Sequence, residues 1–368
     1  MFYCMRSRRD FVKIFFNFFL TLFAYKYTKA AQLMNSLPYH HLPDGTFQNL
    51  PGSLKREYSS NFSYLSFFRF FYKGIIKKEM FNRKEIPDNI PVKHKISQQQ
   101  AKNEFFSNKD FISVTWLGHA SFLLKIGNSN ILTDPYLSKT AGPLGFGPNR
   151  YIKSGMNFSD LPKINTILIS HNHYDHLDTV TLKKFNNKKD IKIICPLKLS
   201  QIFIDIGYTN VIELDWYEEN KDNEFIFTAV PAYHWSRRLG QKRNSTLWNG
   251  YLIKHKFKKI FFSGDTAYGT MFKEIGKKLG PFDLTIIPIG AYEPRKMMQS
   301  SHCTPEEAVE ITSMLVSRNI LGMHWGTIRL SAEDPWEPPK RFKKAALDRG
   351  YKENQIWELS IGQTKSLI

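Results

Sequence analysis

The stretch INTILISHNHYDHLD, residues 164–178, is the part of the sequence that decides the fold. It begins with an apolar run typical of a buried β-strand and continues into a turn crowded with possible metal ligands. Those ligands are His171, His173, Asp175 and His176. Neutral imidazole and carboxylate are natural ligands for Zn²⁺ and similar ions. Because alternate residues after a strand can point the same way, one short loop can direct two ligands at one metal and two at a neighbour.

Further ligands are expected at the ends of other strands. His234 follows FTAVPAY, Asp265 follows KIFFSG and His324 follows NILGM, and α/β folds place ligands just past such runs. A single histidine at a strand end is more often structural. Seven such groups, none of them a cysteine, favour an open hydrolytic metal pair over a closed structural zinc site. The cysteines of the chain are too scattered for a disulfide framework or a cysteine zinc site: Cys4, Cys195 and Cys303.

Length and composition indicate one large α/β domain with extensions. The chain has 368 residues, 42% of them hydrophobic and 15% aromatic, which argues against global disorder. From Phe111 onward strand-like runs alternate with helical patterns, as in α/β folds. Thr304 is expected to cap the last long helix. The sequence predicts strands over 191–196, 211–216, 225–234, 250–255, 259–266 and 284–292, and helices over 178–187, 197–206, 270–279 and 305–318.

The N-terminal third differs from this domain. Residues 1–30 place three arginines before a short apolar run, which predicts a signal peptide or a membrane anchor, with an ordinary amphipathic helix as the alternative. Residues 31–110 form a basic, aromatic extension expected to pack on the core or on a membrane. Its His94 is expected to be a surface residue. These features predict a membrane-associated protein, on a periplasmic or other extracytosolic face if the signal is cleaved.

The charge of the chain indicates an anionic partner. The formal net charge is +19, and residues 1–110 carry 18 Lys and Arg against 8 Asp and Glu. An anionic membrane, a nucleic acid or a phosphorylated substrate fits this balance. A basic composition with solvated surfaces is the simpler alternative.

Several motifs together resemble one family, the N-acyl-phosphatidylethanolamine-hydrolysing phospholipases D of the metallo-β-lactamase superfamily. The resemblance runs from about Tyr39 to the C-terminus, and the block GPFDL…IPIGAYEP at 280–294 is its most particular part. It implies a metallo-β-lactamase-like αββα sandwich over residues 111–368, with an N-terminal extension. The motifs are TWLGHASFLL, LTDPYLS, GPNRY, LISHNHYDHLD, NVIELDWYEEN, FFSGDTAYGTMFKEIGKKLGPFDLTIIPIGAYEPR, PEEAV and HWGT.

The resemblance also implies the ligand set and the reaction. One zinc ion would be held by His171, His173 and His234. The second would be held by Asp175, His176 and His324, and Asp265 would bridge the two, with other divalent metals possible. A hydroxide between the metals would attack phosphorus, expelling the N-acylethanolamine and leaving phosphatidic acid.

Four further residues have proposed roles. Asp175 is expected to orient the hydroxide as well as bind metal, and His302 matches a position near the phosphate or the leaving oxygen, where a protonated ring would assist departure. Asp134 is a candidate for orienting a ligand histidine, although an aspartate that caps a turn is the alternative. His119 is either such a support or a core residue. The sequence departs from the family at Ser301, Cys303-Thr304 and Asn249, none of which is expected to touch a ligand.

Other functions remain open at this stage. A metal-dependent lactonase or a hydrolase of small phosphorylated compounds is the main alternative, followed by a nuclease of the same superfamily. No appended RNA-binding module is evident, so we expect no nucleic acid partner. A scaffold protein with a structural metal is the non-enzymatic alternative. The expected partners are a phospholipid substrate, an anionic membrane surface and a second copy of the chain. The glycine-rich segment 142–150 is expected to border the active site, because it lacks the lysine and the context of a phosphate-binding loop.

Overall fold

The computed structural model describes residues 37–55, 87, 89–222, 224–256 and 258–368. The chain divides into two compact units, Met1–Gln48 and Asn49–Ile368, and every proposed site residue belongs to the second. The expected signal or anchor and most of the aromatic part of the extension lie outside the described residues. Within the described part of the chain, no helix is long and apolar enough to cross a membrane.

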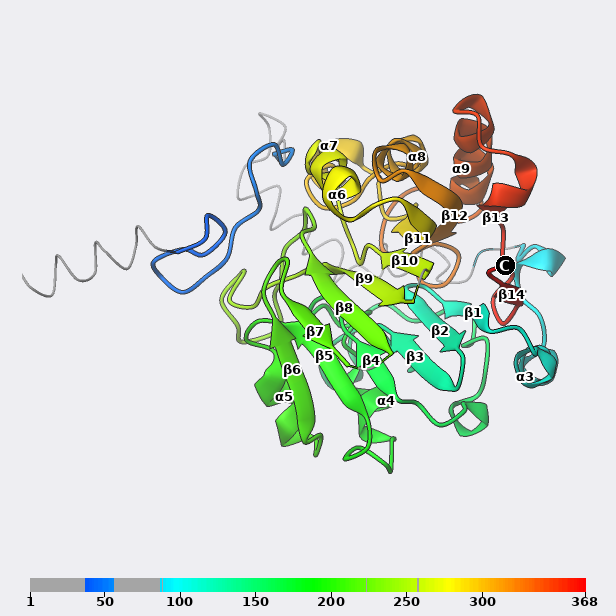
Figure 1. Cartoon of the computed structure of the whole chain (residues 1–368), viewed down its shortest axis with the longest axis horizontal. Coiled ribbons are helices and arrows are strands. Elements are labelled where there is room, and N and C mark those ends of the chain that lie inside the picture. Colours follow the sequence, from blue (N-terminus) through cyan, green and yellow to red (C-terminus); the bar gives the residue numbers. More distant parts are fainter. Residues whose placement is uncertain (1–36, 56–86, 88, 223, 257) are drawn as a thin grey trace, which may run out of the picture. The chain divides into compact units, whose positions relative to one another are not determined.

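The second unit contains two mixed sheets (Figure 1). In the first sheet β14, β1, β2 and β3 run antiparallel, and β3 to β6 run parallel. Its order is β14 (Thr364–Ser366), β1 (Ile112–Gly118), β2 (Ser121–Ile126), β3 (Ser129–Thr133), β4 (Thr166–Leu168), β5 (Lys192–Pro196) and β6 (Asn210–Leu214).

The second sheet has a parallel half and an antiparallel half. Strands β10 to β13 run parallel, whereas β7 to β10 pair antiparallel. Its order is β13 (Ile356–Trp357), β12 (Ser317–Met323), β11 (Phe282–Pro288), β10 (Lys258–Phe262), β9 (Gly250–His255), β8 (Phe225–Val230) and β7 (Glu219–Lys221).

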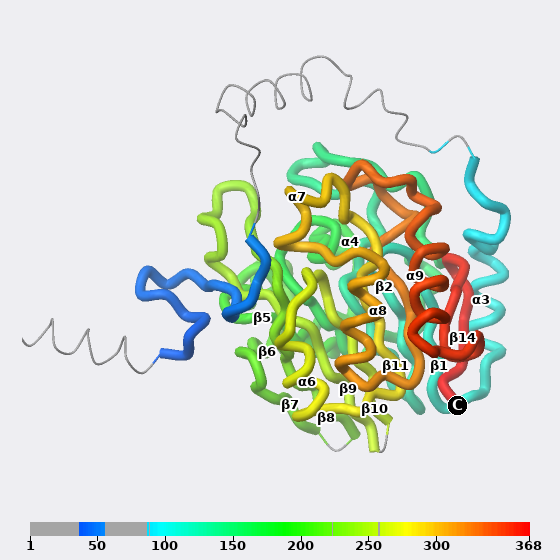
Figure 2. The backbone as a smooth tube through the Cα atoms, turned by 90° about the horizontal axis from the view of Figure 1, so that it is seen from above, coloured from blue at the N-terminus to red at the C-terminus, as the bar shows by residue number. Residues whose placement is uncertain are grey.

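Helices cover the outer face of each sheet (Figure 1, and from above in Figure 2). The first sheet packs on α3 (Gln98–Ser107), α4 (Thr179–Lys183) and α5 (Ser200–Asp205). The second packs on α6 (Met271–Leu279), α8 (Pro305–Met314) and α9 (Glu337–Asp348). The remaining described helical segments are short: η1 (Val92–His94), η2 (Pro143–Gly145), η3 (Phe158–Asp160), α7 (Arg295–Met298) and η4 (Glu353–Gln355).

Alternation along β2 shows how the sequence builds these layers. Phe122 and Leu124 face the core between the sheets, whereas Leu123 faces the core beneath α3, α4 and α5. Strands buried on both faces need apolar residues at successive positions, which explains the continuous apolar runs in the sequence. Each such side chain contributes about 1.5–3 kcal/mol by burial. The predicted αββα sandwich is confirmed.

Most predicted elements are present, but several are shorter: the helix predicted over 178–187 ends at Lys183, and the strands predicted over 225–234 and 284–292 end at Val230 and Pro288. The short strands β7, β13 and β14 were not predicted. Thr304 caps α8 as predicted, in a capping box with Glu307. The helix predicted over 305–318 ends at Met314, because Ser317 already begins β12. Helices α3 and α9 were not predicted; α9 opens with Glu337-Pro338-Pro339, and proline is common in the first turn of a helix, so this start was a signal that the sequence analysis did not use.

Candidate metal centre

The seven proposed ligands all follow strands and meet at one edge of the sandwich. His171 to His176 follow β4, His234 follows β8, Asp265 follows β10 and His324 follows β12. Gly264 allows the chain before Asp265 to lie close to Ser170. It has φ +59°, and a Cβ there would lie 2.7 Å from the Cβ of Ser170. Since only glycine tolerates both conditions, the chain before Asp265 can pass close to the chain before His171.

Three histidines form a first group. The ligand atoms of His171, His173 and His234 lie within 4.8 Å of one another. The Nε2 of His171 is 2.8 Å from the Nδ1 of His173, and the Nε2 of His234 is 3.2 Å from that same Nδ1. Three ring nitrogens therefore converge on one small space.

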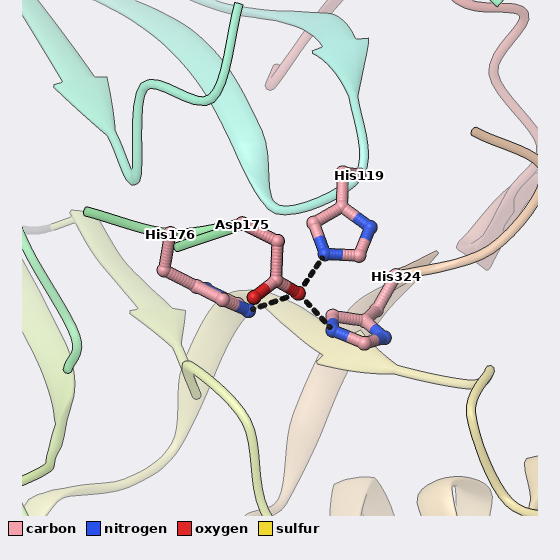
Figure 3. A group of neighbouring side chains, drawn as sticks. All are labelled: His119, Asp175, His176 and His324. Carbon is pink, nitrogen blue, oxygen red and sulfur yellow. Dashed lines mark hydrogen bonds and ion pairs between the residues drawn. The ribbon is translucent and has the colours of Figure 1, made fainter. Parts of the chain in front are cut away.

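A second group surrounds Asp175 (Figure 3). Its Oδ2 lies 3.5 Å from the Nε2 of His176 and 3.6 Å from the Nε2 of His324. It also accepts a hydrogen bond of 2.8 Å from the Nε2 of His119. His119 was predicted as a supporting or core residue, and the structure places it against the proposed ligand Asp175.

Asp265 lies between the two groups. Its Oδ2 is 3.1 Å from the Nε2 of His324 and 3.2 Å from the Nε2 of His176. The same oxygen is 3.8 Å from the Nε2 of His234 and 4.0 Å from the Nε2 of His171. One carboxylate thus faces ligand atoms of both groups, which is the position that a bridging ligand needs.

Hydrogen bonds behind the site determine which ring nitrogens carry lone pairs. The Nδ1 of His234 is 2.9 Å from the carbonyl oxygen of Ser301, which can only accept, so this Nδ1 is the donor. The Nδ1 of His176 donates to Asp134 at 2.7 Å. Ser170 donates its hydroxyl to Asp134 and therefore accepts from the Nδ1 of His171. In each ring the Nε2 is then left with a lone pair that points into the site.

The nitrogens that face the site fit metal ions. Among the described residues, the Nε2 atoms of His176 and His324 and the Oδ1 of Asp265 are buried without a hydrogen-bond partner. Buried polar groups are normally paired, and converging lone pairs repel one another unless a cation lies between them. Imidazole and carboxylate without thiolate suit zinc and similar divalent ions. The residues present therefore fit a pair of such ions.

The electrostatics of the two groups differ. Burial lowers the pKa of His171 well below its ordinary value and that of His173 to about 4. Burial opposes the protonation of His324 too, but the carboxylates of Asp265 and Asp175 outweigh it and raise its pKa to about 9. The carboxylates thus make the second group a place where positive charge is stabilised.

Asp134 and His119 support the ligands from behind. Asp134 accepts from His176, from the hydroxyl of Ser170 and from the backbone N–H of Ser170, at 2.7, 2.6 and 2.7 Å. His119 accepts the backbone N–H of His324 at its carbonyl oxygen, at 3.2 Å. His119, Asp134 and His324 have φ of 57°, 32° and 64°, a region that residues other than glycine seldom adopt. Such conformations cluster at functional sites, where surrounding contacts hold them.

His302 lies at the border of both groups. Its ring centroid is 5.2 Å from that of His234 and 5.3 Å from that of His324, and its Nδ1 is buried without a hydrogen-bond partner among the described residues. Burial lowers the pKa of His302 to about 3, which disfavours the protonated ring expected from the sequence. A neutral ring still donates one N–H.

Two expectations from the sequence are wrong, one about Ser301 and one about the exposure of His94. The departure at Ser301 does touch a ligand, because its carbonyl orients His234. His94 is not a surface residue: it is 5% exposed, and its Nε2 lies 2.6 Å from the carbonyl oxygen of Gly326. Burial lowers the pKa of His94 to about 4, so the neutral ring donates to that carbonyl.

His94 fixes the loop that carries His324. Its ring packs against Trp325 and Trp336 with centroids 4.8 and 4.7 Å apart, and a Cβ on Gly326 would lie 2.4 Å from its Cε1. Sequence reasoning missed this residue because no ligand partner stands near it in the chain. The only available signal was its position three residues after Pro91, which precedes η1.

Comparison with known proteins agrees with this geometry. Residues 129–325, more than half of the chain, match the Beta-lactamase superfamily domain. A UPF0173 metal-dependent hydrolase of Archaeoglobus fulgidus is 28% identical over 241 residues, 64% of this chain and 93% of that protein. The fold and its relatives define a metal-dependent hydrolase of the β-lactamase superfamily, whose histidine and aspartate clusters are candidates for binding the metal.

Two relatives indicate which family of this superfamily the chain belongs to. The N-acyl-phosphatidylethanolamine-hydrolyzing phospholipase D 1 of Caenorhabditis elegans is 36% identical over 279 residues, which cover 73% of this chain and 77% of that enzyme. The mitochondrial enzyme of the same name from Saccharomyces cerevisiae is 35% identical over 246 residues, 65% of this chain and 53% of that protein. The chain belongs to the N-acyl-phosphatidylethanolamine-hydrolysing phospholipase D family.

Solved structures show the same fold at lower identity. Igni18, a metallo hydrolase from Ignicoccus hospitalis, has a TM-score of 0.52 at 20% identity and covers 70% of this chain and 98% of its own. An isothiocyanate hydrolase from Delia radicum gut bacteria has a TM-score of 0.55 at 18% identity, covering 69% and 98%. At these identities they support the fold alone.

Proposed function

We propose that the chain is a zinc-dependent phosphodiesterase of the phospholipase D type. It hydrolyses N-acyl-phosphatidylethanolamine to N-acylethanolamine and phosphatidic acid. The observation that carries the proposal is the position of the Asp265 Oδ2, within 4.0 Å of ligand nitrogens in both groups, in a member of this family. Two metal ions bridged by one carboxylate suit the hydrolysis of phosphate esters.

Each group of ligands has its own place in this proposal. His171, His173 and His234 would hold one ion, Asp175, His176 and His324 would hold the other, and Asp265 faces both groups. A pair of zinc ions in these positions supplies a water nucleophile at neutral pH and positive charge opposite the substrate phosphate. Asp175 keeps one oxygen fixed by His119 at 2.8 Å, so its carboxylate can accept a hydrogen bond from the nucleophile in a defined direction.

His302 acts on the substrate side of the site. Its buried Nδ1 has no partner among the described residues, and its main chain is held at both ends, since its N–H donates to Met298 and its carbonyl accepts from Arg295. A ring fixed in this way can donate an N–H to an oxygen of the phosphodiester as negative charge develops on it.

A small hollow beside His324 has room for only a few water molecules. Its lining is mainly apolar and includes Tyr151, Ile328, Leu330 and Pro338, with Arg329 and Glu333 as charged members.

A comparison of substrates tests the proposal. The full chain loaded with zinc is incubated with vesicles of N-acyl-phosphatidylethanolamine, with an acyl-homoserine lactone and with a soluble aryl phosphodiester. We expect lipid turnover to exceed that of both others and to disappear in His173→Ala. His255→Ala is the matched control, because His255 is also buried but lies at the far end of β9. Preferred turnover of the lactone or of the small phosphodiester would establish the alternative instead.

Deleting residues 31–110 does not separate these alternatives. Phe105 of α3 belongs to the core beneath the first sheet, and His94 holds the loop of His324. The deletion would therefore damage the site for every substrate, so substrates rather than truncations have to be compared.

A further inference from the structure

A hairpin beside the site has a shape that its own residues fix. This rim hairpin comprises residues 139–150, and its neck is closed by hydrogen bonds from the N–H of Arg150 to Lys139 and of Ala141 to Pro148, at 2.8 and 3.0 Å. A Cβ on Gly142 would lie 1.7 Å from the carbonyl oxygen of Phe146, so the two arms approach to a distance that only glycine permits. The tip beyond this neck is therefore held in one shape.

The tip carries two apolar side chains that face solvent. Leu144 is 90% exposed and Phe146 is 76% exposed. Single exposed apolar residues are ordinary on protein surfaces, but two on a fixed, narrow tip at the border of a site indicate an interaction.

A second segment also has an exposed apolar side chain, and it contains more basic residues than the hairpin. This basic loop comprises residues 235–243, and its Leu239 is 74% exposed. It is fixed to the metal-binding turn, because Arg237 and Gln241 both hydrogen-bond to the side chain of Asn172. Arg238 lies 3.8 Å above the ring of Tyr174.

Tyr174 joins the rim hairpin and the basic loop. Its hydroxyl accepts the N–H of Leu239 at 3.1 Å. Its ring packs against the cluster that includes Ala141 of the hairpin neck. Since Tyr174 lies between the ligands His173 and Asp175 in the sequence, the two segments flank the metal-binding turn itself.

The two segments carry basic residues and no acidic ones. Neither 135–159 nor 235–249 contains an Asp or Glu. The neighbouring Asp178 is 4% exposed and caps α4, so it adds no acidic surface. The exposed cations are Lys139 of the hairpin and Arg237, Lys242 and Arg243 of the loop, and Lys153 lies three residues beyond the hairpin.

We propose that the rim hairpin and the basic loop form a docking surface for an anionic lipid bilayer, with Leu144, Phe146 and Leu239 entering the interface. Apolar side chains surrounded by Lys and Arg are the composition with which peripheral proteins bind such surfaces. This inference rests on the proposed function, since docking there would bring the metal-binding turn to the phosphate layer of a lipid substrate.

A local probe tests this surface in the full chain. A polarity-sensitive fluorophore is attached to Phe146→Cys in a Cys4→Ser background, since Cys195 and Cys303 are buried. The matched control carries the fluorophore at Phe111→Cys. Phe111 is 51% exposed, lies near Lys256 and directly precedes β1, at the end of that strand opposite His119. The zinc-loaded protein is mixed with phosphatidylcholine vesicles that either lack phosphatidylglycerol or contain it at about one lipid in three.

The expected result is local and depends on charge. Emission at position 146 should rise at least about twofold and shift to the blue on the anionic vesicles, with a smaller change on neutral ones. Emission at position 111 should not change. No change at position 146, whether or not the protein sediments with the vesicles, would overturn the inference, as would equal changes at both positions or on both kinds of vesicle.

These vesicles contain no N-acyl-phosphatidylethanolamine, so docking is measured without turnover. If the protein docks but does not hydrolyse the lipid, the proposed function fails and the surface stands. If it hydrolyses the lipid while position 146 stays in water, only the surface fails.

Discussion

The Oδ2 of Asp134 accepts a hydrogen bond of 2.7 Å from the Nδ1 of His176, and both side chains are completely buried. This bond fixes the tautomer of His176, so that its Nε2 faces Asp265 at 3.2 Å. Partners of this kind orient metal ligands and raise their basicity.

Replacement of Asp134 should weaken metal binding. We expect Asp134→Ala to lower the zinc affinity of the site about 10- to 100-fold, because His176 and Ser170 both lose their acceptor. A competition titration with a chromophoric chelator measures this change. Asp190→Asn, an exposed aspartate, serves as the control. Unchanged affinity in Asp134→Ala would show that the hydrogen bond does not orient the ligand.

His94 should affect the site although it touches no metal. His94→Ala leaves the carbonyl of Gly326 without its donor and opens a cavity between Trp325 and Trp336, which should cost about 2–4 kcal/mol of stability. We expect weaker zinc binding as well, since the loop also carries His324. His94→Gln retains an N–H donor and should recover part of both losses. Thermal unfolding and zinc titration of the two variants check this, and a loss of stability without any change in zinc affinity would refute the link to the loop.

His302 should affect turnover more than metal content. If it donates to the substrate, His302→Ala should lower kcat about 10²- to 10⁴-fold. Metal analysis should then show the zinc content of the unchanged protein. Because His302 lies in one group with His234 and Asp265, it could instead serve as a ligand. A loss of zinc in parallel with activity would assign it that role.

Removal of metal should destabilise the fold. Seven ligands from four separate strand ends meet at the site, so ions bound there stabilise the folded chain alone; free zinc at about 100 times its dissociation constant would add about 2.7 kcal/mol. We expect a chelator to lower Tm, as measured by calorimetry. In Asp265→Ala the same chelator should have a smaller effect, and equal effects in both proteins would place the stabilising metal elsewhere.

The sequence predicted most of the fold because apolar runs and turns mark strands well. The strands predicted over 250–255 and 191–196 lie where their patterns indicate. The ligand turn also follows its strand directly. Periodicity did not predict α3 or α9, because the positions of these helices depend on contacts with distant strands.

The clustering of the proposed ligands was predictable from the sequence, whereas the residues that support them were not. The ligand residues stand in recognisable spacing after strands, whereas Gly326 and His94 are 232 residues apart and meet only in the folded chain. The backbone carbonyl of Ser301 orients His234, and side-chain types in a sequence do not indicate a backbone contact of this kind. The positive φ of His119, Asp134 and His324 likewise reflects tertiary contacts that no local pattern encodes.

Hydrolysis in ¹⁸O-labelled water tests the central claim most directly. The zinc-loaded chain is given vesicles of N-acyl-phosphatidylethanolamine, and both products are identified by mass, with and without a chelator. Attack at phosphorus predicts one labelled oxygen in phosphatidic acid and none in the N-acylethanolamine, with both products lost in the chelator and in His173→Ala. Label in the N-acylethanolamine, or product formation that survives the chelator, would contradict a metal-dependent phosphodiesterase at this site.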